Sequence, residues 1–166
     1  MQLILASTSP RRRELLALLG IPFEIVAPDF EEVPQPGWSP RQQVEHFARE
    51  KARSIAIARP TVLVLGSDTV IELDGQMLGK PVHLADARVM LTKLAGRPHY
   101  VHTAVALCRQ APHHESVAVE TATVQMKSYD EAAIERYLAT QEPMGKAGAY
   151  SIQGVGGEFI ETICGD

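Results

Sequence analysis

The sequence has few of the features that mark a secreted, membrane-spanning or metal-cluster protein. Cys108 and Cys164 are its only cysteines, and they stand far apart with no metal-ligand spacing. We expect both to be free thiols in a reducing compartment. No run of about 18 or more apolar residues is present, so we expect no membrane-spanning segment. The N-terminus shows no basic leader followed by a small-residue cleavage site. Together these features predict a cytoplasmic protein.

Positive charge is also scarce. The 16 lysines and arginines are outnumbered by 20 acidic residues, which gives a net charge of −4. We therefore do not expect a general nucleic-acid binder, and the basic residues must act locally. The hydrophobic fraction of 45% and the length of 166 residues are ordinary for a globular protein with a real core. We expect one domain over residues 1–166.

The first twenty residues combine a short apolar run with a turn rich in hydroxyl groups. Residues 3–6 predict a buried strand, and Ser7, Thr8 and Ser9 follow it. A helix is predicted to begin at Pro10, with Ser9 as its N-cap and Gly20 as its stop. The leucines that would form its apolar face are Leu15, Leu16, Leu18 and Leu19.

The first turn of this helix contains Arg11, Arg12 and Arg13. The helix dipole disfavours cations there, by about 0.3–1 kcal/mol each when they are exposed. Free backbone N–H groups, hydroxyl groups and guanidinium groups together suit a polyanion. The alternative is a solvated basic turn, but three arginines after a buried strand favour phosphate binding.

A second strand is predicted over residues 21–27, and a proline-rich loop with three acidic residues follows it. Asp29, Glu31 and Glu32 are either simply solvated or ligands of a hard cation such as Mg²⁺, which shares carboxylate oxygens with substrate phosphates.

Ser39-Pro40-Arg41-Gln42 is a capping box that opens a helix predicted to reach about Ala58. Lys51 falls in the middle of its apolar stripe when residues are wound at about 100° each. Either its stem extends along the core and its ammonium reaches water, or the ammonium enters an anionic site. The apolar residues of the stripe are Val44, Phe47, Ala48, Ala52 and Ile55.

The apolar run at residues 61–65 predicts a central strand that ends at Gly66-Ser67-Asp68-Thr69. Asp68 would then lie where ligand crevices form in open α/β sheets, or would serve as a turn residue. Asp74-Gly75 predicts a hairpin, and Gly79-Lys80-Pro81 after it is consistent with a rigidly held cation.

Further along, we expect a helix over residues 84–95, two strands over 99–108 and 116–126, and a helix that begins at the capping box Ser128–Glu131. The helices are predicted to bury Ala87, Leu91, Leu94, Ile134, Tyr137 and Leu138. Four histidines of this region fit no metal spacing and are predicted to be surface residues: His99, His102, His113 and His114.

Five glycines fall within residues 145–157. Glycine lets backbone approach a ligand closely, although the segment lacks a dinucleotide-binding spacing. The neighbouring Ala149 and Tyr150 are apolar, which argues against a free surface loop. We expect a loop that lines a site, with Gln153 as a polar contact.

Several cations around a few acids suit a small phosphorylated molecule. Phosphoryl and nucleotidyl transfer depend on charge neutralisation and positioning, and one carboxylate could activate water or hold a metal that does so. The P-loop pattern and a Ser-His-Asp or Cys-His arrangement are absent. The residues alone therefore predict a metal-assisted hydrolase of a phosphorylated ligand, without choosing the ligand.

As a set, the motifs resemble the Maf-like nucleoside triphosphate pyrophosphatases, and specifically the dTTP/UTP pyrophosphatase branch. They occur in the family's order and cover nearly the whole chain. The matching stretches are Leu5-Ala6-Ser7-Thr8-Ser9-Pro10-Arg11-Arg12, Arg49-Glu50-Lys51-Ala52, Gly66-Ser67-Asp68-Thr69, Gly79-Lys80-Pro81, Gly96-Arg97-x-His99-x-Val101-x-Thr103 and Lys146-Ala147-Gly148-Ala149-Tyr150-x-Ile152-Gln153-Gly154.

The resemblance implies an α/β fold related to inosine triphosphate pyrophosphatases, with an elongated mixed β-sheet flanked by helices and a cleft between two lobes. It implies hydrolysis of dTTP, UTP or modified pyrimidine nucleotides to the monophosphate plus pyrophosphate. It also implies a divalent cation (Mg²⁺, Mn²⁺ or Co²⁺) and a nucleoside triphosphate as the partner, and it allows a homodimer.

The resemblance also implies roles for individual residues. Asp68 would accept the proton of the attacking water, and Glu32 and Asp68 would hold the metal. Arg12, Thr69 and Gln153 would select the base. The phosphates would be bound by Ser7, Arg11, Lys51 and Lys80.

The family normally continues with a further strand and a closing helix, whereas this sequence stops at Gly165-Asp166. Residues 158–163 read as one arm of a hairpin, so we expect an unpaired sheet edge there. Two alternatives stay open: a non-catalytic nucleotide-binding regulator of cell division, and a phosphatase that acts on sugar phosphates.

Overall fold

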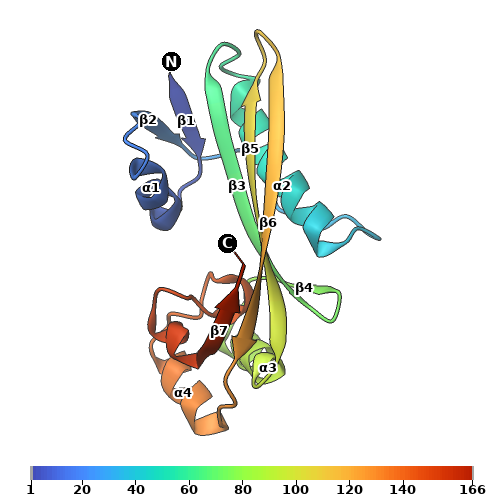
Figure 1. Ribbon diagram of the computed structural model, residues 1–166, viewed down its shortest axis with the longest axis vertical. Helices are drawn as coiled ribbons and strands as arrows, with labels where there is room; N and C mark the ends of the chain where they lie inside the picture. Colours follow the sequence, from blue (N-terminus) through green and yellow to red (C-terminus); the bar gives the residue numbers. More distant parts are fainter. Residues whose placement is uncertain (1, 166) are drawn as a thin grey trace. The chain divides into compact units, whose positions relative to one another are not determined.

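The computed structural model describes residues 2–165, which divide into two compact units. The first unit comprises the residues up to Asp68 together with Thr103–Val119, and the second comprises Thr69–His102 together with the residues from Glu120 onward. The strands form one mixed sheet in the order β2-β1-β3-β5-β6-β7, with β4 paired to β3. Four α-helices flank the sheet (Figure 1), as the predicted α/β class requires. No helix among the described residues is both long and apolar enough to cross a bilayer.

The first unit is built on parallel strands. β1 (Leu3–Ala6) is completely buried and pairs in parallel with both β2 (Phe23–Val26) and the start of β3 (Leu63–Leu73). Helix α2 (Pro40–Ala56) packs against β3 at Gly66, and it begins with the predicted capping box of Ser39 and Gln42. The unit also contains parts of β5 (Pro98–Arg109) and β6 (His114–Met126).

Helix α1 (Pro10–Ala17) differs from the prediction in two respects. Its N-cap residue, Ser9, makes no capping bond through its side chain, and its backbone N–H instead donates to Ser7 Oγ at 3.2 Å. The predicted four-leucine face is also wrong, because only Leu16 is buried. The helix ends at Ala17, so Leu18 and Leu19 lie in the following turn and outside the helical face.

The second unit opens with the predicted hairpin between the end of β3 and β4 (Gln76–Leu78). Both turn residues have positive φ, 54° at Asp74 and 77° at Gly75, as a two-residue turn matched to strand twist requires. Arg97 donates to both carboxylate oxygens of Asp74, at 2.7 and 2.8 Å. After these come α3 (Leu84–Leu94), α4 (Glu131–Ala139), the short helices η1 (Ala147–Ala149) and η2 (Val155–Phe159), and β7 (Ile160–Cys164), which pairs antiparallel with β6.

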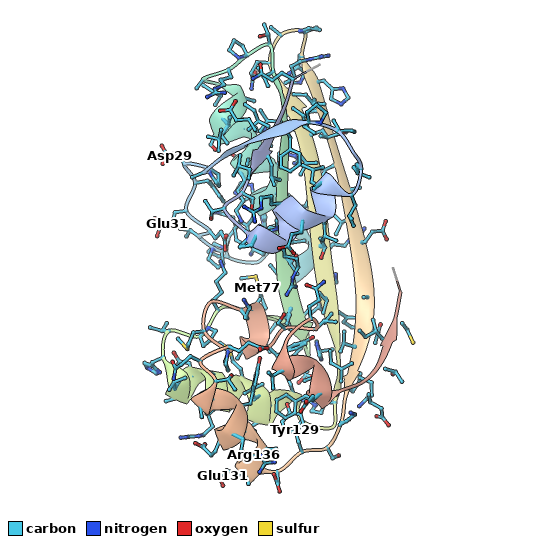
Figure 2. The ribbon with its side chains drawn as sticks, turned by 90° about the vertical axis from the view of Figure 1, so that its left-hand side faces the viewer. Asp29, Glu31, Met77, Tyr129, Glu131 and Arg136 are labelled. Atoms are coloured by element: carbon cyan, nitrogen blue, oxygen red, sulfur yellow. The ribbon has the colours of Figure 1, made fainter. Side chains whose placement is uncertain are left out.

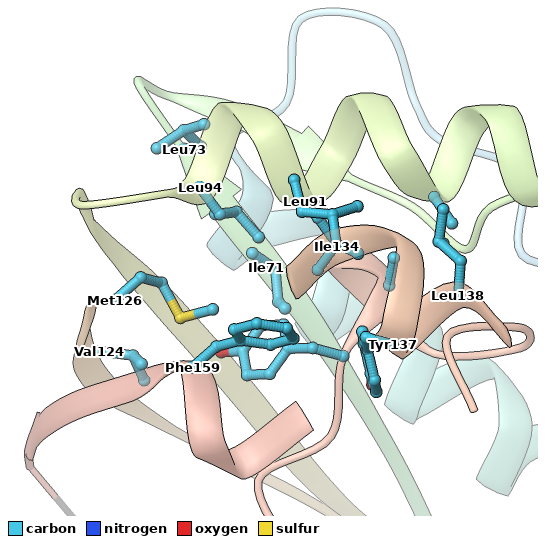
Figure 3. Close-up of a cluster of buried hydrophobic side chains, with 13 residues drawn as sticks. Ile71, Leu73, Leu91, Leu94, Val124, Met126, Ile134, Tyr137, Leu138 and Phe159 are labelled. Atoms are coloured by element: carbon cyan, nitrogen blue, oxygen red, sulfur yellow. The ribbon is translucent and has the colours of Figure 1, made fainter. Parts of the chain in front are cut away.

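The core of the second unit lies between α3, α4 and the sheet (Figure 3). All six predicted inward-facing residues are buried there. In the close-up, Leu91 of α3 faces Ile134 of α4, and Phe159 lies next to Tyr137. The predicted N-cap of α4 was wrong: the helix starts at Glu131, and Asp130 caps it by accepting from Ala133 N at 2.8 Å.

Two of the four histidines contradict the surface prediction. His113 and His114 are exposed, whereas His99 and His102 are buried. His99 Nε2 lies 2.6 Å from the Tyr150 hydroxyl, and His102 Nε2 lies 2.6 Å from Glu72 Oε2. Each ring is buried because a polar partner far along the chain compensates for lost hydration. Neither pairing is visible from local sequence.

Leu91→Ala should lower the free energy of unfolding by about 2–5 kcal/mol, because it opens a cavity in this core. Leu91 is fully buried, whereas Val89 on the same helix is 53% exposed. Val89→Ala is therefore the matched control and should change stability by less than about 0.5 kcal/mol. Urea denaturation measures both, and equal losses for the two variants would contradict the described packing of α3.

Burial lowers the pKa of His99 from 6.5 to about 4. The unfolded chain therefore takes up a proton at pH values where the folded protein keeps this ring neutral. Stability should consequently fall as the pH drops from about 6.5 towards 4, with about 1 kcal/mol lost by pH 5.5 from this residue. Urea denaturation at about pH 7.5 and about pH 5.5 should show a smaller loss for His99→Gln than for the unsubstituted chain. An identical loss would assign the pH dependence to other groups.

Candidate functional site

A buried lysine lies between two carboxylates in the first unit. Lys51 Nζ donates to Asp68 Oδ1 at 2.7 Å and to Glu32 Oε1 at 2.6 Å. Lys51 and Asp68 are only 6% and 4% exposed. Of the two sequence interpretations of Lys51, entry into an anionic site is confirmed and escape of the ammonium to water is wrong. An ammonium can be buried this deeply only because charged partners replace its water.

The close approach of α2 to β3 is what brings Lys51 to Asp68. A Cβ built on Gly66 would collide with the carbonyl oxygen of Ala48 and the backbone nitrogen of Ala52. The atoms in the way are helix backbone, so no rotamer change could make room. Glycine at position 66 therefore determines how closely α2 packs against β3, and so how close Lys51 comes to Asp68.

Asp68 lies in the middle of β3, which runs unbroken from Leu63 to Leu73. The prediction that the strand ends at Asp68 was wrong. What ends there is the neighbouring strand: β1 stops at Ala6, opposite Gly66. Ser7 and Asp68 thus both follow the carboxyl end of a parallel strand pair, which is where such sheets gather functional groups.

Arg12 in the first turn of α1 contacts Asp68 and links it to Ser7, which precedes the helix. Arg12 donates to Asp68 Oδ1 through Nη2 and to Ser7 Oγ through Nη1, each at 3.4 Å. Ser7 is buried and Arg12 is partly exposed. Arg11 is also partly buried, whereas Arg13 is exposed. The structure therefore joins Ser7, Arg12, Lys51, Asp68 and Glu32 in one charged cluster.

Glu32 is the one member of the acidic loop that turns inward. Asp29 and Glu31 are exposed, and Figure 2 shows both side chains projecting outward from the loop. The loop is attached to α2 by Gln43, a residue that the sequence interpretation missed. Its side chain accepts from Gln35 N at 2.9 Å and donates to Gln35 O at 2.6 Å. Gln43 is buried and lies one helical turn before Phe47. A polar side chain at this position of the apolar stripe was the sequence signal for a buried polar contact.

Three predicted site residues belong to the second unit. Thr69 follows Asp68 in β3 and is partly buried, while Lys80 and Gln153 are exposed. Lys80 follows Gly79, whose carbonyl accepts from Gly148 N at 3.0 Å, so the glycine-rich segment contacts the turn that carries Lys80. Gln153 lies between η1 and η2.

The carboxylates of the cluster suit a metal that is shared with a ligand. Asp68 and Glu32 each bind the Lys51 ammonium through one oxygen, so a metal held by this pair would bind through the other oxygen of each carboxylate. Residues 2–165 contain no group of three or more His, Cys, Asp or Glu side chains arranged to hold a metal ion by themselves. Mg²⁺ typically uses one or two protein carboxylates and completes its shell with phosphate oxygens and water. The residues present fit that arrangement.

Lys51→Met should lower the free energy of unfolding by about 3 kcal/mol, because it removes the ammonium that bridges Asp68 and Glu32 and leaves these two negative charges close together. Lys93→Met, on the exposed side of α3, is the control and should change stability by less than about 0.5 kcal/mol. Urea denaturation at neutral pH compares them. If Lys51→Met were as stable as the control, the ammonium would not be holding the cluster together.

The chain was compared with known proteins. The family model described as Maf-like protein matches residues 2–166. A dTTP/UTP pyrophosphatase of Symbiobacterium thermophilum is 46% identical over 165 residues, which cover 99% of this chain and 84% of the relative.

Two solved structures are similar in fold. The nucleoside-triphosphatase / dITP/XTP pyrophosphatase of Mycobacterium abscessus has a TM-score of 0.50 at 22% identity, covering 76% of this chain and 74% of that protein. The Ham1 protein of Staphylococcus aureus has a TM-score of 0.55 at 16% identity, covering 76% and 72%. At such identities these likenesses show the fold alone, and that fold is the one the sequence predicted. By its match to the family model over nearly all of its length, the chain belongs to the Maf-like family.

Proposed function

We propose that this protein is a nucleoside triphosphate pyrophosphatase that hydrolyses dTTP and UTP to the monophosphate and pyrophosphate. The observation that carries the proposal is the buried Asp68 carboxylate, which contacts both Lys51 and Arg12. A carboxylate among cations suits water activation next to a polyphosphate. The substrate is supported by the 46% identity to a dTTP/UTP pyrophosphatase.

In the proposed reaction, Asp68 accepts a proton from water as the water oxygen bonds to the α-phosphorus. The bond between the α-phosphorus and the bridging oxygen breaks, and pyrophosphate leaves with the electron pair. Lys51 uses two of its three N–H bonds for Asp68 and Glu32, so the third can donate to a phosphate oxygen. Arg11, Arg12 and the Ser7 hydroxyl supply further donors for the triphosphate, and charge neutralisation of this kind is the main source of rate in such reactions.

We also propose that Glu32 and Asp68 hold a divalent cation when the nucleotide is bound. Such a cation neutralises charge on the phosphates and lowers the pKa of bound water. The support is that Asp68 and Glu32 lie side by side on the Lys51 ammonium through one oxygen each, so the second oxygen of each would be a ligand of the cation. Mg²⁺, Mn²⁺ and Co²⁺ are the candidates. The base-selecting roles of Arg12, Thr69 and Gln153 and the phosphate-binding role of Lys80 are part of the same proposal.

Asp68→Asn tests the proposal. The amide cannot accept the proton of water, so pyrophosphate release should fall by about 10²–10⁴-fold, while nucleotide binding largely survives because the cations remain. The measurement is a panel of nucleoside triphosphates with identification of the products in the presence of Mg²⁺, Mn²⁺ or Co²⁺. Asp29→Asn, which changes an exposed acid of the same unit, is the control and should keep full activity.

The outcomes separate the alternatives. Full activity of Asp68→Asn would refute the role of Asp68. Binding of dTTP by the unsubstituted chain without turnover, with any of the three metals, would favour a non-catalytic nucleotide-binding regulator. Release of orthophosphate in place of pyrophosphate would indicate a phosphatase.

A further inference from the structure

One carboxylate in the second unit binds the end of the glycine-rich segment. Glu142 Oε2 accepts from Val155 N at 2.9 Å, and Glu142 Oε1 accepts from both Gly156 N at 3.0 Å and the Tyr137 hydroxyl at 3.0 Å. We call this set of three bonds the Glu142 latch. It connects the start of η2 to the end of α4. None of its residues takes part in the proposed reaction.

The glycines of the segment make room for the latch. A Cβ on Gly154 would overlap the Glu142 carboxylate, and one on Gly156 would overlap the Tyr137 hydroxyl. From the sequence these glycines were expected to let backbone approach a ligand. In the structure they let backbone approach Glu142 and Tyr137 of the same chain, so the segment is held in place and is not a flexible loop.

The electrostatics of the latch favour an ionised carboxylate. Burial by itself would raise the pKa of Glu142. The N–H groups of Gly156 and Val155, the Tyr137 hydroxyl and the nearby charge of Lys146 outweigh it and lower that pKa below 4.5. Tyr137 is 2% exposed, so bulk water cannot readily replace the Glu142 carboxylate as the acceptor for its hydroxyl.

A second anchor lies within the segment. The hydroxyl of the buried Tyr150 lies 2.6 Å from Nε2 of the buried His99, which belongs to β5. His99 Nδ1 has no hydrogen-bond partner among the described residues, so Tyr150 is what the ring is positioned against. The two anchors bracket Ile152-Gln153-Gly154, all three of which are exposed.

An exposed glutamine held between two anchors is suited to recognition. Its amide presents one donor and one acceptor side by side, which matches the adjacent carbonyl and N3–H of a uracil or thymine ring. A side chain presented from a fixed backbone loses less entropy on binding than one presented from a mobile loop. The value of Gln153 for selecting a base therefore depends on how firmly residues 152–154 are held.

We propose that Glu142 is a positioning residue for pyrimidine selection, acting through the latch on the placement of Gln153. This inference rests on the proposed function and on contact between Gln153 and the nucleobase. Because the base is remote from the reacting phosphorus, loosening the latch should weaken substrate binding and leave the chemical step largely intact.

Glu142→Gln tests the proposal, because the amide nitrogen cannot accept and one backbone N–H loses its partner. The KM for UTP should rise about tenfold with kcat within about twofold, and the preference for UTP over GTP in kcat/KM should fall about tenfold. Hydrogen exchange at the Val155 and Gly156 amides, without nucleotide, should speed up at least about tenfold. Glu158→Gln removes an exposed charge from η2 and should change none of these quantities.

A purely structural role would reduce the active fraction. It would lower kcat equally for UTP and GTP and leave both KM and the preference unchanged, which would overturn the proposal. Tyr137→Phe removes one bond of the latch while keeping the ring, so it should shift the same quantities by a smaller factor. If Glu142→Gln fails to fold, Tyr137→Phe provides the test in its place.

Failure of the proposed function is distinguishable from failure of this inference. If the unsubstituted chain released no pyrophosphate, only the proposed reaction would be refuted. Calorimetric dissociation constants for UTP and GTP, measured on the chain and on Glu142→Gln, would then give the preference directly. An unchanged ratio of these constants would overturn the positioning role.

Discussion

The candidate site depends on one ammonium group that is buried among carboxylates. Lys51 contacts Asp68 and Glu32 at hydrogen-bonding distance, and the three groups come from a helix, a strand and a loop. Burying a charge is costly unless its partners are fixed in place. Here the partners are fixed by two unrelated means. Gly66 lets the helix backbone lie against the strand, and Gln43 binds the backbone of the acidic loop.

In the second unit, too, polar groups are held by specific partners, but these contacts are not all ion pairs. Its irregular segment from Tyr150 to η2 is held by side-chain contacts with other parts of the chain: His99 with Tyr150, and Glu142 with the amides of η2. Each contact satisfies a polar group that would otherwise be buried without a partner. Segments without regular hydrogen bonding of their own thereby take up a defined position.

Sequence patterns correctly predicted several features that depend on interactions between neighbouring residues. The capping box at Ser39, the turn at Asp74-Gly75 and the apolar faces of α3 and α4 all depend on residues a few positions apart. The unusual position of Lys51 was also visible in the sequence, because burying a cation on the apolar stripe of a helix costs free energy. The burial of His99 was not predicted, because a local pattern does not reveal a partner distant in the chain. The contact between Gln43 and Gln35 was missed although the two residues lie close in sequence. The end of β3 was misplaced because Gly66-Ser67-Asp68 resembles a turn, whereas the glycine is there to accept a helix.

The contact at Gly66 has a consequence for inheritance as well as for structure. The first two bases of a glycine codon define the amino acid, so any change at either base places a Cβ, or a stop, at position 66. That atom would meet the helix backbone, which cannot be relieved by choosing a smaller or more polar residue. The gene can therefore drift silently at the third base of this codon, while almost every other single-base change there would displace the helix that carries Lys51.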